Sequence, residues 1–162
     1  MNNFYKRKQL RLGQYNYADS GLYFITICGQ NRIKYFGEIV NKELKLNQAG
    51  NMIEYLWLDI PKRFDSIELR EYIIMPNHFH AIVEISPRST VSLGEVVGAF
   101  KSLTTNEYIK GVKKSNWLAF DKRLWQRNYY EHVIRDEVSH YFIAEYIQNN
   151  PLKWEEDKLY IS

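Results

Sequence analysis

The chain has 162 residues, of which 45% are hydrophobic and 25% are charged, the proportions of an ordinary globular protein with one domain. Its net charge of +3 is too small to identify a nucleic-acid-binding protein by itself. The single Cys28 excludes an intrachain disulfide framework, and no apolar run approaches the ~18 residues of a membrane span, so we expect a soluble, cytoplasmic protein without a membrane partner.

The order of predicted elements alternates between strands and helices. The first 20 residues are polar and basic, so we expect one domain over residues 1–162, with an arm over 1–20 and a core over 21–154. Hydrophobic periodicity predicts strands over 21–29, 67–75, 78–85 and 124–134, a hairpin over 36–46, and helices over 47–60, 92–111 and 136–149. The predicted helix N-caps are Asn47, Ser92 and Asp136, and the predicted stops are Pro61 and Pro151. This order predicts an α+β sandwich with a ferredoxin-like or RRM-like core, in which helices pack on one antiparallel sheet.

Basic residues are concentrated in two stretches. Residues 1–12 contain four basic and no acidic side chains, and residues 100–130 contain seven basic against two acidic ones. A local basic excess suits a phosphate backbone, although a solvated face is its commoner meaning. The candidate DNA-binding residues are Lys6, Arg7, Lys8, Arg11, Lys101, Lys113, Lys114, Arg123 and Arg127. Trp117, Trp125 and Tyr129 either stack on bases or belong to the core.

His78 and His80 flank Phe79 within a predicted strand. Side chains at positions i and i+2 of a strand project from the same face, so both imidazoles point the same way. Two such imidazoles can share one divalent cation, whereas an arbitrary pair is more often an unrelated polar feature of a strand. The apolar segments on either side favour a central strand, and with it the metal-site interpretation.

The segment MPNHFHAIVE resembles the His-hydrophobic-His signature of the HUH endonucleases, and more narrowly the REP-associated branch of the single-tyrosine transposases related to insertion sequences. The similarity continues over about residues 20–154, in GLYFITICGQNRIKYFGEI, VVGAFKSLTT, LWQRNYYEHVIRDE and EYIQNNPLKW. The resemblance implies an enzyme that cleaves and rejoins single-stranded DNA bearing hairpins or palindromic repeats. It implies a 5′-phosphotyrosine intermediate and a divalent cation, Mg²⁺ or Mn²⁺.

The resemblance also implies the roles of individual residues. The family's nucleophile lies in a Tyr-Ile-x-x-Asn-Pro pattern, which places it at Tyr146 and makes Asn150 the third metal ligand beside His78 and His80. Without the family, Tyr146 would be interpreted as a packed aromatic residue and Asn150 as a helix C-cap. Two imidazoles and an amide oxygen suit Mn²⁺ better than Mg²⁺ by ligand softness.

Other tyrosines are the rivals for the nucleophile. Tyr129 and Tyr130 lie in a predicted strand, whose packing is the simpler interpretation. Tyr141 precedes Tyr146 by five residues, a spacing that does not place both on one helix face, so a single-tyrosine enzyme is expected.

Two other functions fit parts of the sequence. An RRM-like module would bind single-stranded nucleic acid without cutting it, and a metal-dependent hydrolase would activate water without forming a tyrosine adduct. The sequence leaves the oligomeric state open between monomer and homodimer. The basic arm is interpreted either as lying along a hairpin stem or as disordered without DNA.

Overall fold

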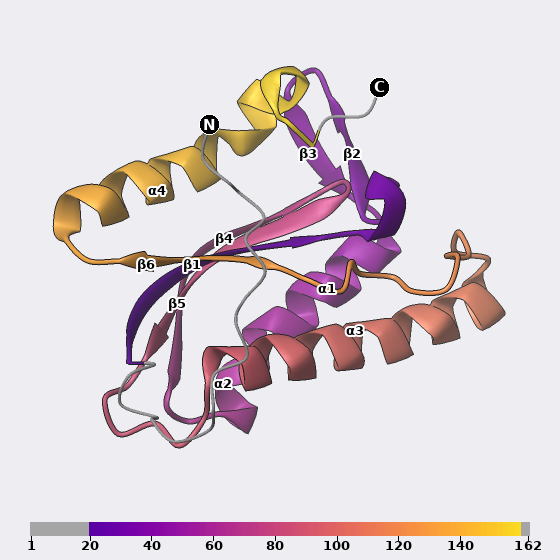
Figure 1. Cartoon of the computed structure of the whole chain (residues 1–162). Helices are drawn as coiled ribbons and strands as arrows, with labels where there is room; N and C mark the ends of the chain where they lie inside the picture. The colour runs from indigo at the N-terminus through magenta and orange to yellow at the C-terminus, as the bar shows by residue number, and fades with distance from the viewer. Residues whose placement is uncertain (1–19, 160–162) are drawn as a thin grey trace.

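A computed structural model describes residues 20–159 of the chain, so the predicted basic arm, with Lys6, Arg7, Lys8 and Arg11, lies outside the described residues. The centre of the fold is a four-stranded antiparallel sheet with the strand order β4-β5-β1-β6 (Figure 1). These strands are β1 (Gly21–Cys28), β4 (Ile67–Met75), β5 (His78–Ile85) and β6 (Tyr130–Ile134). A separate hairpin pairs β2 (Gly37–Val40) with β3 (Glu43–Leu46).

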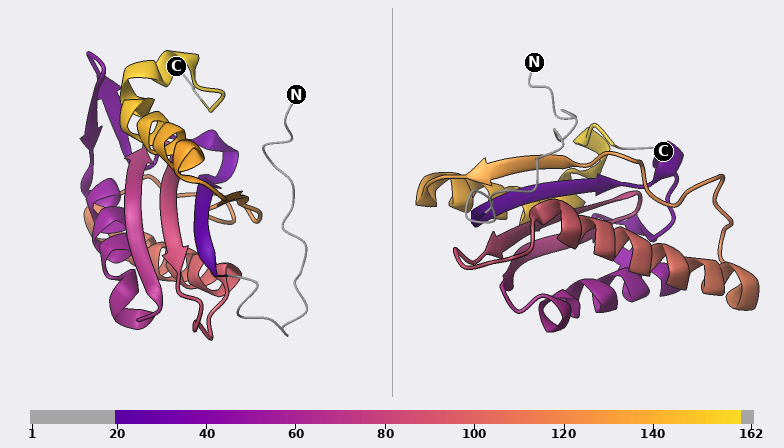
Figure 2. Two further views of the ribbon diagram at one scale, coloured as in Figure 1. Left: turned by 90° about the vertical axis from the view of Figure 1, so that its left-hand side faces the viewer. Right: turned by 60° about the horizontal axis from the view of Figure 1, so that its bottom comes forward.

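Helices cover both faces of the sheet (Figures 1 and 2). One layer contains α1 (Gln48–Leu58), the short α2 (Ile60–Arg63) and the long α3 (Leu93–Ser115). The opposite face carries α4 (Glu137–Asn149), which continues into the 3-10 helix η3 (Asn150–Glu156). The sheet with α1 and α3 on one face is the predicted ferredoxin-like α+β arrangement, which is confirmed.

The alternation of side chains along the strands creates two apolar layers. Ile25 and Phe79 face α1 and α3 in the larger core. Phe24 and Ile82 point to the other face, where they pack with Ile147 of α4. Because residues of β5 at even numbers share that second face, His78 and His80 lie on the α4 side of the sheet.

The three predicted helix N-caps are confirmed. Asn47 accepts a hydrogen bond from the Gly50 amide at 2.8 Å, and the Asp136 carboxylate accepts one from the Ser139 amide at 2.7 Å. Ser92 forms a capping box with Glu95, in which each side chain accepts a hydrogen bond from the other residue's amide. These local signals set where each long helix begins.

Three predicted boundaries are wrong. The first helix ends at Leu58, and Pro61 lies in the first turn of α2, because a proline fits the start of a helix where its missing N–H is not needed. The second long helix passes Gly111 and ends at Ser115. The last strand begins at Tyr130 instead of residue 124, and the preceding loop touches the sheet through one bridge, between Gly29 and Trp125. Within residues 20–159, no helix is both long and apolar enough to cross a bilayer.

Candidate active site

The pairing of β5 with β1 places the two histidines in the middle of the sheet. His80 lies opposite Thr26 and His78 opposite Cys28 in this antiparallel pair. The ring centroids of His78 and His80 are 4.5 Å apart, and the two residues are only 0% and 3% exposed. The predicted common orientation of the imidazoles is therefore observed, on a face that is buried beneath the C-terminal elements.

Each imidazole is hydrogen-bonded through Nδ1. Thr26 Oγ1 lies 2.8 Å from Nδ1 of His80, and Asn77 Oδ1 lies 2.7 Å from Nδ1 of His78. The amide oxygen of Asn77 only accepts, so His78 carries its proton on Nδ1. The Nε2 atoms of both histidines are buried and have no hydrogen-bond partner among the described residues. An oriented imidazole with a free Nε2 is the usual form of a histidine metal ligand.

Burial also keeps both histidines neutral. It lowers the pKa of His78 to about 3, against a smaller opposing effect of the nearby Asn150 amide. Burial likewise lowers the pKa of His80 well below its ordinary value, and the adjacent His78 adds to the effect. Both side chains thus present lone pairs at neutral pH, as metal ligation requires.

The end of α4 brings Asn150 and Tyr146 to the histidines. Asn150 is 3% exposed, donates a hydrogen bond from Nδ2 to the Tyr146 carbonyl at 3.3 Å, and leaves its buried Oδ1 unpartnered within the described chain. The Tyr146 ring packs edge-on against His80 with centroids 5.4 Å apart, and against Phe24 at 6.2 Å. Burial raises the pKa of Tyr146, the Asn150 side chain opposes this, and Asp157 adds a smaller increase, so the phenol is protonated at neutral pH.

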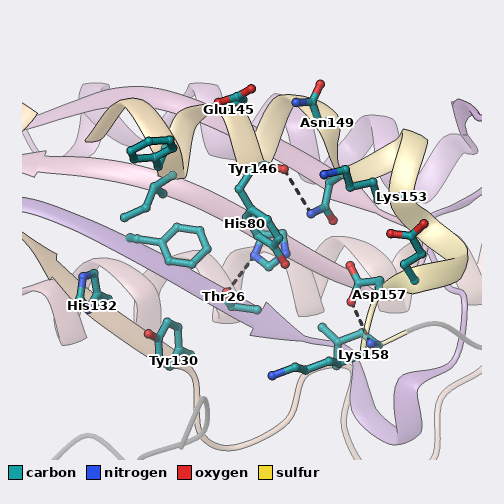
Figure 3. A pocket seen from close by; sticks show the side chains of 16 residues that line it. Thr26, His80, Tyr130, His132, Glu145, Tyr146, Asn149, Lys153, Asp157 and Lys158 are labelled. Atoms are coloured by element: carbon teal, nitrogen blue, oxygen red, sulfur yellow. Dashed lines mark hydrogen bonds between the residues drawn. The ribbon is translucent and has the colours of Figure 1, made fainter. Parts of the chain in front are cut away.

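A cavity of about 690 Å³ opens beside these residues (Figure 3). Its lining includes an apolar wall with Phe24, Tyr130 and Phe142, together with Asn150 and several polar residues that follow it in the chain. A concave site with an apolar wall and a few convergent polar groups is typical of a binding site for a small molecule or a single nucleotide.

The rival tyrosines differ in position. Tyr130 lines the same cavity and packs edge-on against Phe24, with ring centroids 6.0 Å apart. Tyr129 packs against the larger core, on the other side of the sheet. Tyr141 is 65% exposed and is not among the residues that line the cavity. On geometry alone, Tyr130 and Tyr146 are thus the two tyrosines that line the cavity among residues 20–159.

One acidic residue beside the histidines, Asp157, was not predicted from the sequence. Ligand atoms of His78, His80 and Asp157 lie within 4.8 Å of one another, and Asp157 Oδ2 is 3.8 Å from Nε2 of His78. Asp157 stands in the sequence Glu-Glu-Asp-Lys, where a solvated charge cluster is the ordinary interpretation. Only the fold of the segment after α4 turns its side chain inward (Figure 3). The cavity also receives Lys153 and Lys158, two basic residues outside the predicted DNA-binding set.

The predicted basic residues of the described chain do not gather at this cavity. Lys101, Lys113 and Lys114 belong to α3, in the layer on the opposite face of the sheet. The ammonium group of Lys101 donates to the carbonyls of Gln126 and Arg127 at 2.7 and 3.0 Å, and burial lowers the pKa of Lys101 to about 8. Lys101 therefore holds the loop that carries Arg123 and Arg127, and its contact with DNA stays a prediction.

Two of the aromatic residues proposed for base stacking pack inside the protein. Trp125 is 3% exposed and its indole N–H donates to Thr104 Oγ1 at 2.9 Å, so stacking of Trp125 on a base is excluded and the core interpretation is correct. Trp117 is partly buried against Tyr108, and its indole N–H donates to Gln48.

Comparison with known proteins gives matches along most of the chain. The family described as "Transposase IS200 like" matches residues 19–150. An uncharacterized protein of Haemophilus influenzae is 40% identical over 96% of this chain and 93% of its own length. A second protein of the same organism, named a REP-associated tyrosine transposase, is 26% identical over 85% of this chain and 74% of its own length.

Two solved structures share the fold. A REP-associated tyrosine transposase bound to a REP hairpin superposes with a TM-score of 0.64 and 19% identity, over 86% of this chain and 72% of its own. A Deinococcus radiodurans protein described as a transposase gives a TM-score of 0.53 and 17% identity, over 89% and 96% of the two chains.

Proposed function

Because the chain belongs to the family of IS200-like transposases, we propose that it cleaves and rejoins single-stranded DNA with one tyrosine and one divalent cation. Tyr146 is the proposed nucleophile, and His78, His80 and Asn150 are the proposed metal ligands. The observation that carries this proposal is a group of three neighbouring side chains whose buried ligand atoms have no hydrogen-bond partner among the described residues: Nε2 of His78, Nε2 of His80 and Oδ1 of Asn150. Buried polar atoms are rarely left unpaired, and a bound cation would satisfy all three.

The donor set fits Mn²⁺ or Mg²⁺. The imidazoles favour Mn²⁺, and the amide oxygen is acceptable to both ions. When bound, the cation would neutralise charge on the scissile phosphate and align it for in-line displacement. Thr26 and Asn77 support this arrangement because they hold the two imidazoles with Nε2 directed toward the shared site.

Tyr146 then supplies the covalent chemistry. Its phenol oxygen attacks the phosphorus, and the bond from phosphorus to the 3′-oxygen breaks. The phenol loses its proton, the released 3′-oxygen gains one, and the 5′-phosphate remains on Tyr146. Attack of another 3′-hydroxyl on this phosphotyrosine reverses the step and joins two strands, so no external energy source is needed. The raised pKa of Tyr146 makes an activated phosphate necessary, since a neutral phenol is a weak nucleophile.

Hairpin-bearing DNA is the proposed substrate, as for the relative whose structure contains a REP hairpin. The cavity beside Tyr146 would receive a single nucleotide at the scissile position, with its base against the apolar wall. The basic residues at the end of α3 and in the loop before β6 would contact phosphates farther along the strand, whereas Lys101 holds that loop. The N-terminal residues Lys6, Arg7, Lys8 and Arg11 are proposed to follow the hairpin stem.

The decisive experiment identifies the tyrosine that becomes linked to DNA. A hairpin-bearing single strand with a 3′-end label is incubated with the protein and Mn²⁺ and analysed on a denaturing gel. Attack by Tyr146 leaves the labelled downstream fragment on the protein, so we expect a shifted protein band. Tyr146→Phe should abolish this band, whereas Tyr141→Phe, a matched change on the exposed side of α4, should keep it.

The remaining outcomes separate the alternatives. Loss of the band in Tyr130→Phe together with its retention in Tyr146→Phe would assign the chemistry to the other tyrosine of the cavity. Cleavage without any covalent band would indicate a hydrolase that activates water. Binding without cleavage would indicate a nucleic-acid-binding module. Each of these three results contradicts the proposed mechanism.

A further inference from the structure

The residues after α4 return to the histidine pair and are held there by several contacts. The Trp154 ring stacks on His78 with centroids 6.1 Å apart and an interplanar angle of 24°. Asn77 Nδ2 donates to the Leu159 carbonyl at 2.6 Å, and Leu159 is itself 4% exposed. Asp157 lies between these two attachment points. The segment is therefore packed against the site on both sides of Asp157.

The two oxygens of the Asp157 carboxylate have different surroundings. Oδ1 accepts a hydrogen bond from the Leu159 amide at 2.8 Å. Oδ2 points to the histidines, 3.8 Å from Nε2 of His78, which is too far for a hydrogen bond. Two ligands bound at about 2.1 Å to one ion are about 3 Å apart when adjacent and about 4.2 Å apart when opposite. The observed distance falls between these values, so the two atoms can share one cation.

The burial of the Asp157 carboxylate also supports a shared cation. Its side chain is only 7% exposed, so water compensates little of its negative charge. A buried carboxylate is commonly compensated by a basic partner or by a metal ion.

We propose that Asp157 is a fourth, anionic ligand of the divalent cation, supplied by the segment that Asn77 holds against the site. The proposal rests on the metal site described under the proposed function and extends its ligand set. Asn77 would act as a positioning residue for two ligands, because its Oδ1 orients His78 while its Nδ2 holds the chain next to Asp157. His78, His80, Asn150 and Asp157 would together hold the cation, which would remain able to bind a phosphate oxygen of the DNA. A ligand set of two imidazoles and an amide is uncharged, so the carboxylate would raise the affinity for the cation before DNA binds.

The test measures Mn²⁺ binding by the full chain without DNA. Titration with Mn²⁺ is followed by the EPR signal of the free ion, for wild type and for Asp157→Asn. The asparagine keeps an oxygen that accepts from the Leu159 amide and removes the charge. We expect Mn²⁺ affinity to fall by at least about tenfold, since loss of an outer partner of a metal ligand already costs about 10–100-fold. Glu155→Gln is the matched control, because this neighbouring carboxylate is exposed and does not line the cavity, and its affinity should stay within about twofold of wild type.

Thermal unfolding separates ligation from a structural role. Without metal, Asp157→Asn should unfold at the same or a higher temperature than wild type, because a buried charge is removed. Added Mn²⁺ should raise the unfolding temperature of Asp157→Asn less than that of wild type. If Asp157 were only structural, Asp157→Asn would unfold at a lower temperature than wild type without metal. Added Mn²⁺ would then raise the unfolding temperatures of both proteins equally. Equal Mn²⁺ affinities of Asp157→Asn and wild type, or equal losses in Asp157→Asn and Glu155→Gln, would overturn the proposal.

The DNA assay distinguishes this failure from failure of the proposed function. A wild-type protein that forms the covalent band but binds Mn²⁺ no better than Asp157→Asn refutes the fourth ligand alone. A wild-type protein that binds no Mn²⁺ and forms no band refutes both proposals.

Discussion

Replacing Thr26 by valine tests whether the partner of His80 controls metal binding. The substitution keeps the side-chain shape and removes the hydroxyl that lies 2.8 Å from Nδ1 of His80. For His80 to bind a cation through Nε2, its Nδ1 must carry the proton and donate it to Thr26. In Thr26→Val that buried N–H has no acceptor in the metal-bound form. Without metal, the proton can move to Nε2 of His80, a residue that lines the cavity.

The expected loss of Mn²⁺ affinity follows from the unsatisfied N–H of His80 in the metal-bound form. An unsatisfied buried donor costs about 1–3 kcal/mol, and 1.4 kcal/mol corresponds to about tenfold in affinity. Because Thr26 is 6% exposed, water offers little compensation, and we expect Mn²⁺ binding to weaken by about 10–100-fold. Thr26→Ser retains the hydroxyl and should restore most of the affinity.

The assay is the same Mn²⁺ titration, with unfolding by urea as the measure of stability. Ile27→Val is the matched control, because Ile27 is the next residue of β1, is fully buried and faces the larger core. It should lower the free energy of unfolding by about 0.5–1.5 kcal/mol and leave Mn²⁺ affinity unchanged. If Thr26→Val binds Mn²⁺ within about twofold of wild type, Thr26 does not fix the proton of His80 and the reasoning is wrong.

Three further changes have defined outcomes. Lowering the pH from 7.5 to 5.5 should destabilise the metal-free protein by up to ~1.4 kcal/mol per pH unit for each of His78 and His80. The reason is that these histidines bind protons near pH 6.5 in the unfolded chain but stay neutral in the folded one. A free energy of unfolding in urea that does not change over this pH range would contradict the lowered pKa values. Lys101→Met should lower the free energy of unfolding by ~1–3 kcal/mol, because two loop carbonyls lose their donor, whereas weaker DNA binding at unchanged stability would instead identify Lys101 as a phosphate contact. Asn150→Leu should weaken Mn²⁺ binding by at least about tenfold in the same titration, and unchanged affinity would remove Asn150 from the ligand set.

Local signals in the sequence predicted the beginnings of the elements better than their ends. Asn47, Ser92 and Asp136 act as N-caps because capping depends on residues three positions apart. The end of α3 was missed because Gly111 has another role there. A Cβ atom on Gly111 would lie 2.1 Å from the Trp117 ring, so this glycine makes room for a side chain that folds back on the helix. The helix instead ends at Ser115, and the capping residue Asn116 adopts the left-handed conformation with φ of 57°.

Some features of the candidate site follow from residues close together in the sequence, and others depend on residues far apart in the chain. The shared face of His78 and His80 follows from strand geometry alone, and the sequence therefore predicted it. Thr26 could not be recognised, because it meets His80 only through the register of two strands 54 residues apart. Asp157 could not be recognised either, because its inward orientation depends on Asn77 and Trp154, which are remote from each other in the chain.

The assembly of the site also has a consequence for folding. The histidines belong to a strand in the middle of the chain, whereas Tyr146, Asn150 and Asp157 follow the last strand of the sheet. The sheet with α1 and α3 is therefore built entirely from residues that precede these three in the chain. Under the proposed mechanism, a molecule with a finished sheet but an undocked α4 would be unable to cut DNA, and nuclease activity would begin only when α4 and the following segment dock on the sheet.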